Sequence, residues 1–427
     1  MVKIGLLGCG TVGSGVAKLL QQNGQEIEQK LGTSIVVSKV LDLDTDKCKA
    51  LGFTDDQIVS DFTVILNDPE IEIVLELIGG IEPARTFVLQ AMQKGKHVVT
   101  ANKDLIALHG KELFETADAN HVDFYFEASV GGGIPIITPM KQTLAANQIQ
   151  EVIGILNGTT NYILTKMSKE GLDFADVLAE AQSLGYAEAD PTSDVGGLDA
   201  ARKISILASI AFNSRVTFHD VYCEGITGIT ALDIKIAHEM GYVIKLLAIA
   251  KADNGKIQAR VHPTFLPQTH PLANVNDVFN AVFIRGDAVG DVMLYGRGAG
   301  QMPTASSVVG DVIEIVRNQQ SGSNGRVGCT CYQESPIQDM AEVRNQFYIR
   351  MQVTDQPGVL AGIAGVFGNN NVSLASVMQQ ADPLDLAELV LITHQVREKD
   401  LQNALTILKG MSIVSSIDNV IRLEGTK

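Results

Sequence analysis

Short apolar runs alternate with longer amphipathic stretches over the first part of the chain, up to about residue 135. Short apolar runs bounded by glycine or polar residues are typical of buried strands, and apolar residues at helical spacing indicate helices. The pattern predicts helices that begin near Val16 and cover 83–94 and 113–120, and strands at 3–7, 35–41, 71–78, 97–100 and 123–127. This alternation predicts a doubly wound α/β domain with a parallel sheet.

The part from about 136 to 300 mixes helices with longer strand-like runs. Predicted helices cover 138–147, 175–184 and 197–212, and predicted strands cover 149–156, 243–252, 258–265, 282–286 and 291–295. Successive strands joined by short turns predict a mainly antiparallel sheet, so this part is α+β. A further helix is predicted at 302–317.

The C-terminal part follows a stretch, 318–324, whose composition is typical of a linker. From about 346 onward, the predicted order is strand 347–355, helix 358–369, strands 372–380 and 387–396, helix 399–409 and strand 413–423. This βαββαβ order is the ferredoxin-like pattern.

Length and composition narrow the class of protein. A chain of 427 residues predicts two or three domains. A net charge of −16 argues against a nucleic acid or an anionic membrane surface as partner. The five cysteines are scattered, which predicts a reducing cytoplasm, and Cys329 and Cys331 match no usual zinc spacing and are interpreted as loop thiols. No apolar run reaches the length of about 18 residues that a membrane-spanning helix needs.

A glycine turn joins the first strand to the first helix. Its spacing is Gly8-x-Gly10-x-x-Gly13, and the strand and helix on either side give it the context of a dinucleotide site. Gly8 would allow the tight turn, Gly10 would let the backbone approach a pyrophosphate, and Gly13 would let the helix pack on the strand. The alternative is an ordinary strand-to-helix turn.

Asp42 ends the second strand, where an acidic side chain can bind the ribose hydroxyls of NAD and would repel the extra phosphate of NADP. The charge favours NAD. Two observations leave the choice open: Asp42 could merely start a turn, and Lys39 and Lys47 are close enough along the chain to bind a phosphate.

Asp199 and Lys203 are four residues apart and share one face of the predicted helix at 197–212. An exposed ion pair is one interpretation. The other takes account of the acidic loop before the helix, which contains Glu188 and Asp194 and could surround a substrate ammonium group beside a lysine that acts as acid or base.

Two further groups lie at strand ends. Lys103 follows the strand at 97–100 and is a second candidate cation, either catalytic or a cofactor contact. Glu127 precedes a glycine-rich bend whose carbonyl groups suit a hard cation bound by oxygen, although a glycine hinge between domains would look the same.

Several motifs together resemble the homoserine dehydrogenases of the monofunctional, three-domain kind with a C-terminal ACT domain. Besides the glycine loop they are Thr100-Ala-Asn-Lys103, Glu127-Ala-Ser-Val-Gly-Gly-Gly-Ile-Pro135, Leu156-Asn-Gly-Thr-Thr-Asn-Tyr162, Gly185-Tyr-Ala-Glu-Ala-Asp-Pro191 and Gly197-Leu-Asp-Ala-Ala-Arg-Lys203. The resemblance covers essentially the whole length. It implies a Rossmann-like nucleotide-binding domain at 1–135, to which the helix at 302–317 returns. It also implies an α+β catalytic and dimerisation domain at 136–317, a linker at 318–345 and a ferredoxin-like ACT domain at 346–427.

The resemblance also implies roles for individual residues. Lys203 and Lys103 match catalytic lysines, and Gly185, Glu188, Asp194 and Asp199 match positions around the amino acid. The cofactor positions are Gly8, Cys9, Gly10, Thr11, Val12, Gly13, Asp42, Lys103 and Gly300, and a sodium-type monovalent cation site is matched by Glu127 with the carbonyls of Val130, Gly132 and Ile134. Many members carry an arginine near the end of the second strand that binds the NADP phosphate, and the acidic sequence here departs from that pattern.

The reaction implied is the reversible reduction of L-aspartate 4-semialdehyde to L-homoserine by NADH or NADPH, in the biosynthesis of threonine and methionine. The ACT domain implies feedback by L-threonine, or a domain that only dimerises, and the family implies a homodimer or a homotetramer. Two alternatives stay open: a non-catalytic amino-acid sensor that uses the ACT domain, and another Rossmann-type amino-acid dehydrogenase.

Overall fold

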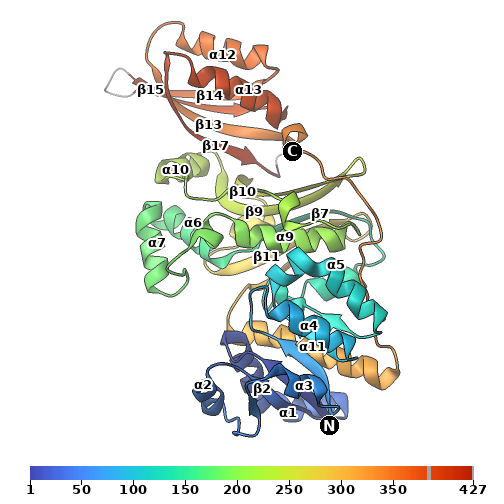
Figure 1. The fold of residues 1–427 in the computed structure, drawn as a ribbon. Helices are drawn as coiled ribbons and strands as arrows, with labels where there is room; N and C mark the ends of the chain where they lie inside the picture. Colours follow the sequence, from blue (N-terminus) through green and yellow to red (C-terminus); the bar gives the residue numbers. More distant parts are fainter. Residues whose placement is uncertain (382–385, 426–427) are drawn as a thin grey trace. The chain divides into compact units, whose positions relative to one another are not determined.

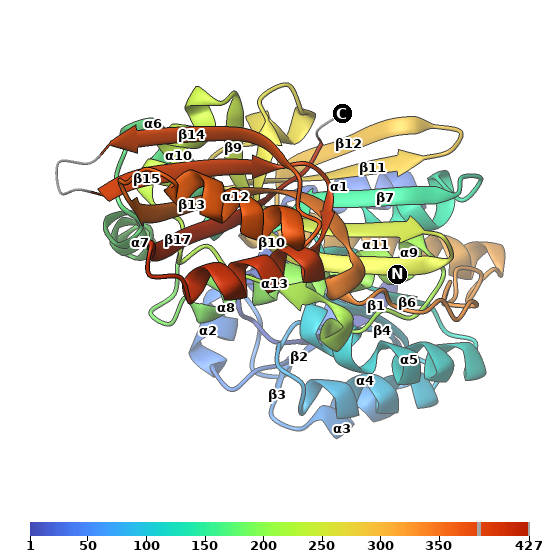
Figure 2. The same ribbon diagram turned by 90° about the horizontal axis from the view of Figure 1, so that it is seen from above.

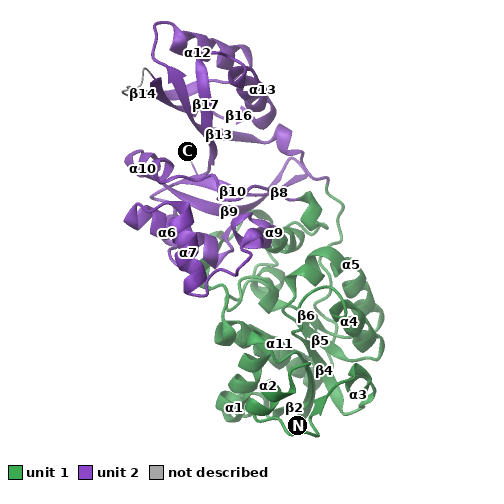
Figure 3. Cartoon of the chain, turned by 60° about the vertical axis from the view of Figure 1, so that its left-hand side comes forward, with its two compact units in different colours: residues 1–152, 202–220, 279–335 green, residues 153–201, 221–278, 336–427 purple. Residues whose placement is uncertain are grey.

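The computed structural model describes residues 1–381 and 386–425, and these residues form two compact units (Figures 1 and 3). Unit 1 comprises 1–152, 202–220 and 279–335, and unit 2 comprises 153–201, 221–278 and 336–427. Within the described ranges, none of the helices combines the length and the apolar character needed to cross a membrane.

Unit 1 is built on a six-stranded parallel sheet, as the alternation of strands and helices predicts. Its strand order is β3-β2-β1-β4-β5-β6, with bounds Ile58–Val59, Ile35–Leu41, Val2–Leu7, Ile71–Glu76, His97–Thr100 and Phe124–Tyr125. Strands β1 to β3 are added toward one edge of the sheet and β4 to β6 toward the other. The boundary between β1 and β4 is therefore the topological switch point, where doubly wound folds bind nucleotides.

Two long helices, α1 (Thr11–Leu31) and α11 (Gln301–Ser321), share one hydrophobic core with β1 and β4 of unit 1. The sheet is accompanied by four further helices, α2 (Thr45–Ala50), α3 (Phe62–Asn67), α4 (Ala84–Gln93) and α5 (Lys103–Ala119). Unit 1 also holds the antiparallel hairpin of β11 (Phe279–Gly286) and β12 (Gly290–Arg297), and β7 (Ile149–Ile155) crosses from unit 1 to unit 2 along the chain.

Unit 2 contains a long antiparallel hairpin, β9 (Tyr242–Asp253) and β10 (Lys256–Pro267). Its turn is Asn254-Gly255, and both residues have positive φ (49° and 76°), as the tight turn of a two-residue hairpin requires. The short β8 (Tyr222–Cys223) pairs with β10. The unit also contains α6 (Gly158–Glu170), α7 (Phe174–Ser183), α8 (Thr192–Val195) and α10 (Ala231–Glu239), and α9 (Leu198–Ala211) starts here and ends in unit 1.

The C-terminal part of unit 2 has the predicted βαββαβ order. Its strands run β17-β13-β15-β14 across an antiparallel sheet, with bounds Val414–Leu423, Arg344–Thr354, Leu386–Thr393 and Leu374–Ala381. The helices α12 (Val359–Asn369) and α13 (Glu398–Lys409) cover the sheet and share its apolar core (Figure 2). A two-residue strand, β16 (Val396–Arg397), pairs with β13.

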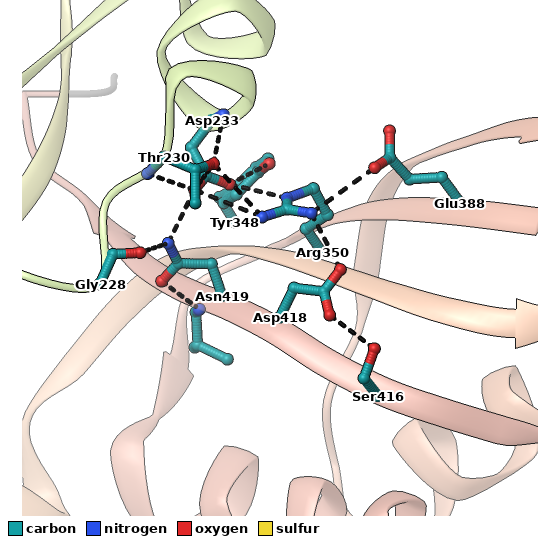
Figure 4. A network of polar contacts seen from close by, with 10 residues as sticks. Gly228, Thr230, Asp233, Tyr348, Arg350, Glu388, Ser416, Asp418 and Asn419 are labelled. Carbon is teal, nitrogen blue, oxygen red and sulfur yellow. Dashed lines mark hydrogen bonds and ion pairs between the residues drawn. The ribbon is translucent and has the colours of Figure 1, made fainter. Parts of the chain in front are cut away.

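This C-terminal sheet is joined to the β9–β10 hairpin. β17 pairs in parallel with β10, with Arg422 opposite Thr264 and Leu423 opposite Phe265. A polar network around the fully buried Asp233 of α10 adds a second connection, because Arg350, Tyr348 and Asn419 all donate hydrogen bonds to its carboxylate (Figure 4).

Four predicted elements differ from the structure. The helix expected at 113–120 begins at Lys103, because Asn102 caps it and Gly110 does not interrupt it. The helix expected at 138–147 is one π-helical turn, Pro139–Thr143, and the strand expected at 123–127 ends at Tyr125, so that Glu127 lies in a 3₁₀ turn. The predicted linker starts too early, because α11 continues to Ser321 and buries Asn318.

Candidate active site

The three glycines of the β1–α1 turn each meet a different steric demand. Gly8 has φ +98°, and a Cβ there would lie 2.7 Å from the Leu77 carbonyl oxygen. A Cβ on Gly13 would lie 2.0 Å from the Gly8 carbonyl oxygen, whereas one on Gly10 would meet no atom within 4 Å. The turn is therefore tightly packed at Gly8 and Gly13 and open at Gly10, which precedes the N-terminus of α1. A pyrophosphate binds at this open position in the motif.

Asp42 lies at the end of β2, and its carboxylate is directed back to the glycine loop. The backbone N–H of Cys9 donates to one of its oxygens, and the N–H of Asp44 donates to the other at 2.8 Å. Lys39, which the sequence left as a possible phosphate ligand, donates instead to the carbonyl of Asp56 at 2.5 Å.

A buried network at the ends of β4 and β5 fixes the start of α5. Glu76, which is fully buried, accepts a hydrogen bond from the Thr100 hydroxyl at 2.6 Å. Asn102 donates to the Gly80 carbonyl at 2.6 Å and caps α5 by accepting from the Leu105 N–H at 3.1 Å. Lys103 is thereby held at the first position of the helix. No sequence motif predicts a role for Glu76, although its position at the carboxyl end of a central strand was a signal.

The two predicted lysines lie on helices that meet within unit 1. Lys103 opens α5 and Lys203 lies in the second turn of α9, and both side chains are half-buried. Their chain neighbours form an ion pair, since Arg202 Nε lies 2.5 Å from Asp104 Oδ1. This ion pair brings the lysine-bearing turns of the two helices together.

Asn157 organises the acidic residues of unit 2. Its side-chain amide donates to Asp194 at 2.7 Å and to the buried Asp199 at 3.0 Å. Its carbonyl oxygen accepts from the Thr160 N–H at 2.8 Å and caps α6. Asn157 belongs to the motif Leu156–Tyr162, from which no role was predicted for it. An asparagine between a strand and a Gly-Thr-Thr segment was the available signal for a helix cap.

The other two predicted substrate residues lie in the loop between α7 and α8. Gly185 and Glu188 are exposed there, and Gly185 has φ +73°. The loop is held from both sides: the Thr159 hydroxyl donates to the Tyr186 carbonyl at 2.6 Å, and Gln182 donates to the Glu188 carbonyl at 3.1 Å. The bond from Thr159 connects the loop to the start of α6, next to Asn157, and the bond from Gln182 connects it to the end of α7.

The glycine-rich bend after Glu127 is tightly packed within unit 1. Gly131 and Gly132 have φ +74° and +52°, and a Cβ on Gly132 would lie 2.5 Å from the Gly298 carbonyl oxygen. The bend therefore lies against the turn that contains Gly300, the residue that precedes α11. The structure thus brings the predicted cation-binding segment and the predicted cofactor contact Gly300 together.

The Glu127 side chain is buried and accepts three backbone hydrogen bonds, from the N–H groups of Ile136 (2.5 Å), Ile137 (2.7 Å) and Thr138 (2.8 Å). Its own N–H donates to the carboxyl of Asp311 at 2.9 Å. Burial, together with the nearby charge of Glu127, raises the pKa of Asp311 well above its usual range. Glu127 thus has a clear structural role, which is to hold the turn at 136–138.

Profiles of known protein families match this chain over most of its length. The profile described as homoserine dehydrogenase matches 135–313, that of the homoserine dehydrogenase NAD-binding domain matches 8–127, and that of the ACT domain matches 347–411. Among curated relatives, the homoserine dehydrogenase of Synechocystis sp. is 48% identical over 99% of both chains. That of Corynebacterium glutamicum is 47% identical over 99% of this chain and 96% of its own.

Solved structures agree with these matches. A homoserine dehydrogenase from Thiobacillus denitrificans is 43% identical and superposes with a TM-score of 0.94 over 99% of this chain and 98% of that one. A hyperthermophilic archaeal homoserine dehydrogenase in complex with NADPH is 29% identical, with a TM-score of 0.63 over 74% of this chain and 98% of its own. The chain therefore belongs to the homoserine dehydrogenase family and is an NAD(P)-dependent oxidoreductase with a C-terminal ACT domain.

Proposed function

We propose that this enzyme interconverts L-aspartate 4-semialdehyde and L-homoserine, and that Asp194, Asp199 and Glu188 bind the ammonium group of the amino acid. One observation carries the proposal: a single amide, that of Asn157, binds the carboxylates of both Asp194 and Asp199. Two carboxylates held together attract a cation. Asp199 stands one turn before Lys203 on α9.

Lys203 and Lys103 are the proposed acid–base pair. A nicotinamide bound at this site would supply a hydride to the aldehyde carbon, or accept one from the alcohol carbon of L-homoserine. The carbonyl oxygen then needs a proton, and an ammonium group can both polarise the oxygen and donate that proton. We assign the proton to Lys203, directly or through a water, and the position beside the cofactor to Lys103.

We further propose that NAD is preferred to NADP. Asp42 supports this preference, because its carboxylate lies at the glycine loop and would repel a phosphate on the adenine ribose. The NADPH in the archaeal relative belongs to that protein, which is only 29% identical to this one.

A monovalent cation, sodium in our proposal, would bind at the bend after Glu127. The donor set fits in part. Gly131 and Gly132 have positive φ, which bends the chain here, and carbonyl oxygens such as those of Val130, Gly132 and Ile134 are the hard ligands that such a cation prefers. The carboxylate of Glu127 is largely committed to backbone N–H groups, and the Gly132 carbonyl already accepts a hydrogen bond from Ser307 at 2.7 Å. We therefore assign the cation mainly to carbonyl oxygens.

At the level of domains, we propose a nucleotide-binding domain at 1–135, joined by the helix at 302–317, and a catalytic and dimerisation domain at 136–317. A linker follows the end of α11 at Ser321 and runs to 345, and the ACT domain covers 346–427. The packing of α11 against α1 supports the return of that helix. We also propose a cytoplasmic homodimer or homotetramer with L-threonine as ligand of the ACT domain.

The experiment is oxidation of L-homoserine by the full chain, followed through reduced-nicotinamide absorbance, for the wild type, Lys203→Ala and Lys111→Ala. Lys111 is an exposed lysine of α5 and serves as the control. The loss of a positioned general acid–base group lowers the rate about 10²–10⁴-fold. Near-normal turnover of Lys203→Ala would show that Lys203 is not the proton donor. No turnover of folded wild type with NAD or NADP would contradict the proposed substrate.

A further inference from the structure

A pocket in unit 1, away from the glycine loop, brings two thiols and two cationic side chains together. Cys329 and Cys331 lie on the segment that follows α11, and they line the pocket with Lys141 and Arg215. The pocket encloses about 370 Å³, part of it open to solvent, and both thiols are half-buried. None of these four residues has a role in the proposed oxidoreductase chemistry.

Cys329 accepts hydrogen bonds that favour its thiolate. The guanidinium of Arg215 donates to its sulfur at 3.6 Å, and the backbone N–H of Cys331 donates to the same sulfur at 3.5 Å. The hydrogen bond from the Cys331 thiol, reinforced by these two contacts, outweighs burial and lowers the pKa of Cys329 to about 6. The same thiol–thiol hydrogen bond, together with burial, raises the pKa of Cys331.

The two basic side chains are held by the surrounding structure, and burial lowers the pKa of Lys141 below its usual range. The Arg215 guanidinium stands 6.0 Å from the centre of the Phe114 ring. A Cβ on Gly110 would lie 2.9 Å from Arg215, so the glycine inside α5 leaves room for this side chain. Lys141 lies on the π-helical turn 139–143, a rare geometry that is frequent at functional sites, and its ammonium is 5.5 Å from the Phe114 and Phe126 rings.

We infer that Cys329 and Cys331 form a peroxide-reactive dithiol, in which Cys329 is the nucleophile and Cys331 the resolving thiol. The Cys329 thiolate attacks the terminal oxygen of a hydroperoxide, the O–O bond breaks, and the alkoxide leaves as an alcohol after it takes a proton from the pocket. The Cys331 thiol then attacks the resulting sulfenic acid and releases water. The two thiols thus lose two protons and two electrons, and the hydroperoxide is reduced to alcohol and water.

The spacing allows the disulfide to form. Two Cα atoms separated by one residue can lie at most about 7 Å apart in an extended chain. Disulfides join Cα atoms that are about 4.4–6.8 Å apart, so a modest bend of this loop brings the sulfurs into bonding range. Cys331 is anchored near the end of α9, since its thiol contacts the Ser209 carbonyl at 3.8 Å.

The test measures both steps on the full-length protein. The rate of alkylation by iodoacetamide at pH 7 is compared, by peptide mass spectrometry, for Cys329 and for Cys223, another half-buried thiol of the chain. A thiol with a pKa near 6 is mostly ionised at this pH, so we expect Cys329 to react at least about fivefold faster. In Arg215→Met the ratio of the Cys329 rate to the Cys223 rate should fall, and in Arg215→Lys it should lie between those of Arg215→Met and the wild type. Should Arg215→Met not fold, the pH profile of alkylation of the wild type gives the same information.

Hydrogen peroxide is the probe for the second step. We expect the wild-type peptide that contains both cysteines to lose two hydrogens, and Cys331→Ser to accumulate a sulfenic acid on Cys329 that dimedone traps. Cys223→Ser should behave like the wild type. Equal alkylation rates for Cys329 and Cys223, or two free thiols after peroxide treatment, would overturn the inference.

Discussion

At the scale of single residues, Asp42 shows how a strand end can select a ligand. Its two oxygens bind backbone N–H groups of the glycine loop and of its own turn, so the carboxylate is held in place before any cofactor binds. A fixed negative charge discriminates between NAD and NADP more sharply than a mobile one, because the 2′-phosphate of NADP cannot push the carboxylate aside at low cost.

We expect Asp42→Asn to lower the ratio of kcat/KM for NAD to that for NADP. Removing a charged hydrogen-bonding partner is worth about 1.5–3 kcal/mol, so the ratio should fall roughly 10- to 100-fold. Steady-state kinetics with both cofactors measure it, and Asp44→Asn, which changes the neighbouring exposed carboxylate, is the control. An unchanged ratio in Asp42→Asn would contradict the role given to this charge.

His262 carries the second prediction at this scale. It is buried on β10, where its Nε2 accepts from Arg260 at 3.2 Å and its Nδ1 lies 3.0 Å from the Pro263 carbonyl, so the ring is neutral. Burial, with the charges of Arg422 and Arg260, lowers its pKa well below the usual range. The native state then takes up no proton on this ring at a pH where the unfolded state does.

Because the pKa of His262 is lower in the folded than in the unfolded protein, its contribution to the free energy of unfolding is full above the pKa of the unfolded state. This contribution is lost as the pH falls below that value. Below about pH 6.5 the free energy of unfolding should decline by roughly 1.4 kcal/mol per pH unit from this ring alone. Urea unfolding between pH 5 and 8 should show a shallower slope for His262→Gln, whereas the exposed-site control His394→Gln should keep the wild-type slope. Identical slopes in all three proteins would refute the assignment.

At the scale of elements, the sequence predicts the bounds of helices and strands well wherever the local hydrophobic pattern and the tertiary packing agree. β2 and β5 have the predicted bounds because their apolar runs end at polar or glycine residues. The start of α5 was not predicted because Gly110 weakens the helical pattern. The glycine is explained by the Arg215 side chain, which packs beside it and comes from about a hundred residues later in the chain. The lysines and acidic residues of the proposed site are predictions from motifs, whereas Glu76 and Asn157 act through hydrogen bonds that no spacing reveals.

Asn157 connects three elements: it caps α6 with its oxygen and holds Asp194 of α8 and Asp199 of α9 with its amide. Asn157→Asp keeps the cap and removes the amide donor, which leaves three carboxylates together. Because the added charge repels Asp194 and Asp199 and no amide holds them in position, we expect KM for L-homoserine to rise about tenfold or more and the melting temperature to fall.

The control separates capping from binding. Asp61→Ala removes the cap of α3, where the Asp61 carboxylate accepts from the Thr63 N–H at 2.8 Å, and should lower the melting temperature without altering KM. If Asn157→Asp changed the melting temperature and left KM unaltered, the acidic cluster would be structural rather than substrate-binding.

At the scale of the whole molecule, unit 2 joins the ACT domain to the β9–β10 hairpin through paired strands and buried charge. β17 extends the hairpin by pairing with β10, and Arg350 of β13 binds Asp233 of α10 at 2.8 Å and Asp418 of β17 at 2.9 Å (Figure 4). A ligand of the ACT domain that shifted β13 or β17 would therefore act directly on α10. Burial raises the pKa of Asp233, but the hydrogen bonds from Arg350, Thr230 and Asn419 outweigh it and lower the pKa overall, so the carboxylate stays charged.

Arg350→Met tests how much this connection contributes. It leaves Asp233 buried and charged without its main partner, which costs about 3–5 kcal/mol, so unit 2 should melt at a clearly lower temperature and α10 should exchange its amide hydrogens faster. Arg397→Met is the matched control, because the ion pair of Arg397 with Asp400 is more exposed and its loss should change the melting temperature far less. The double variant Arg350→Met/Asp233→Asn should recover part of the loss, because the unpaired charge is gone. If Arg350→Met melted like Arg397→Met, the strand pairing of β10 with β17 would hold the ACT domain without help from the buried network.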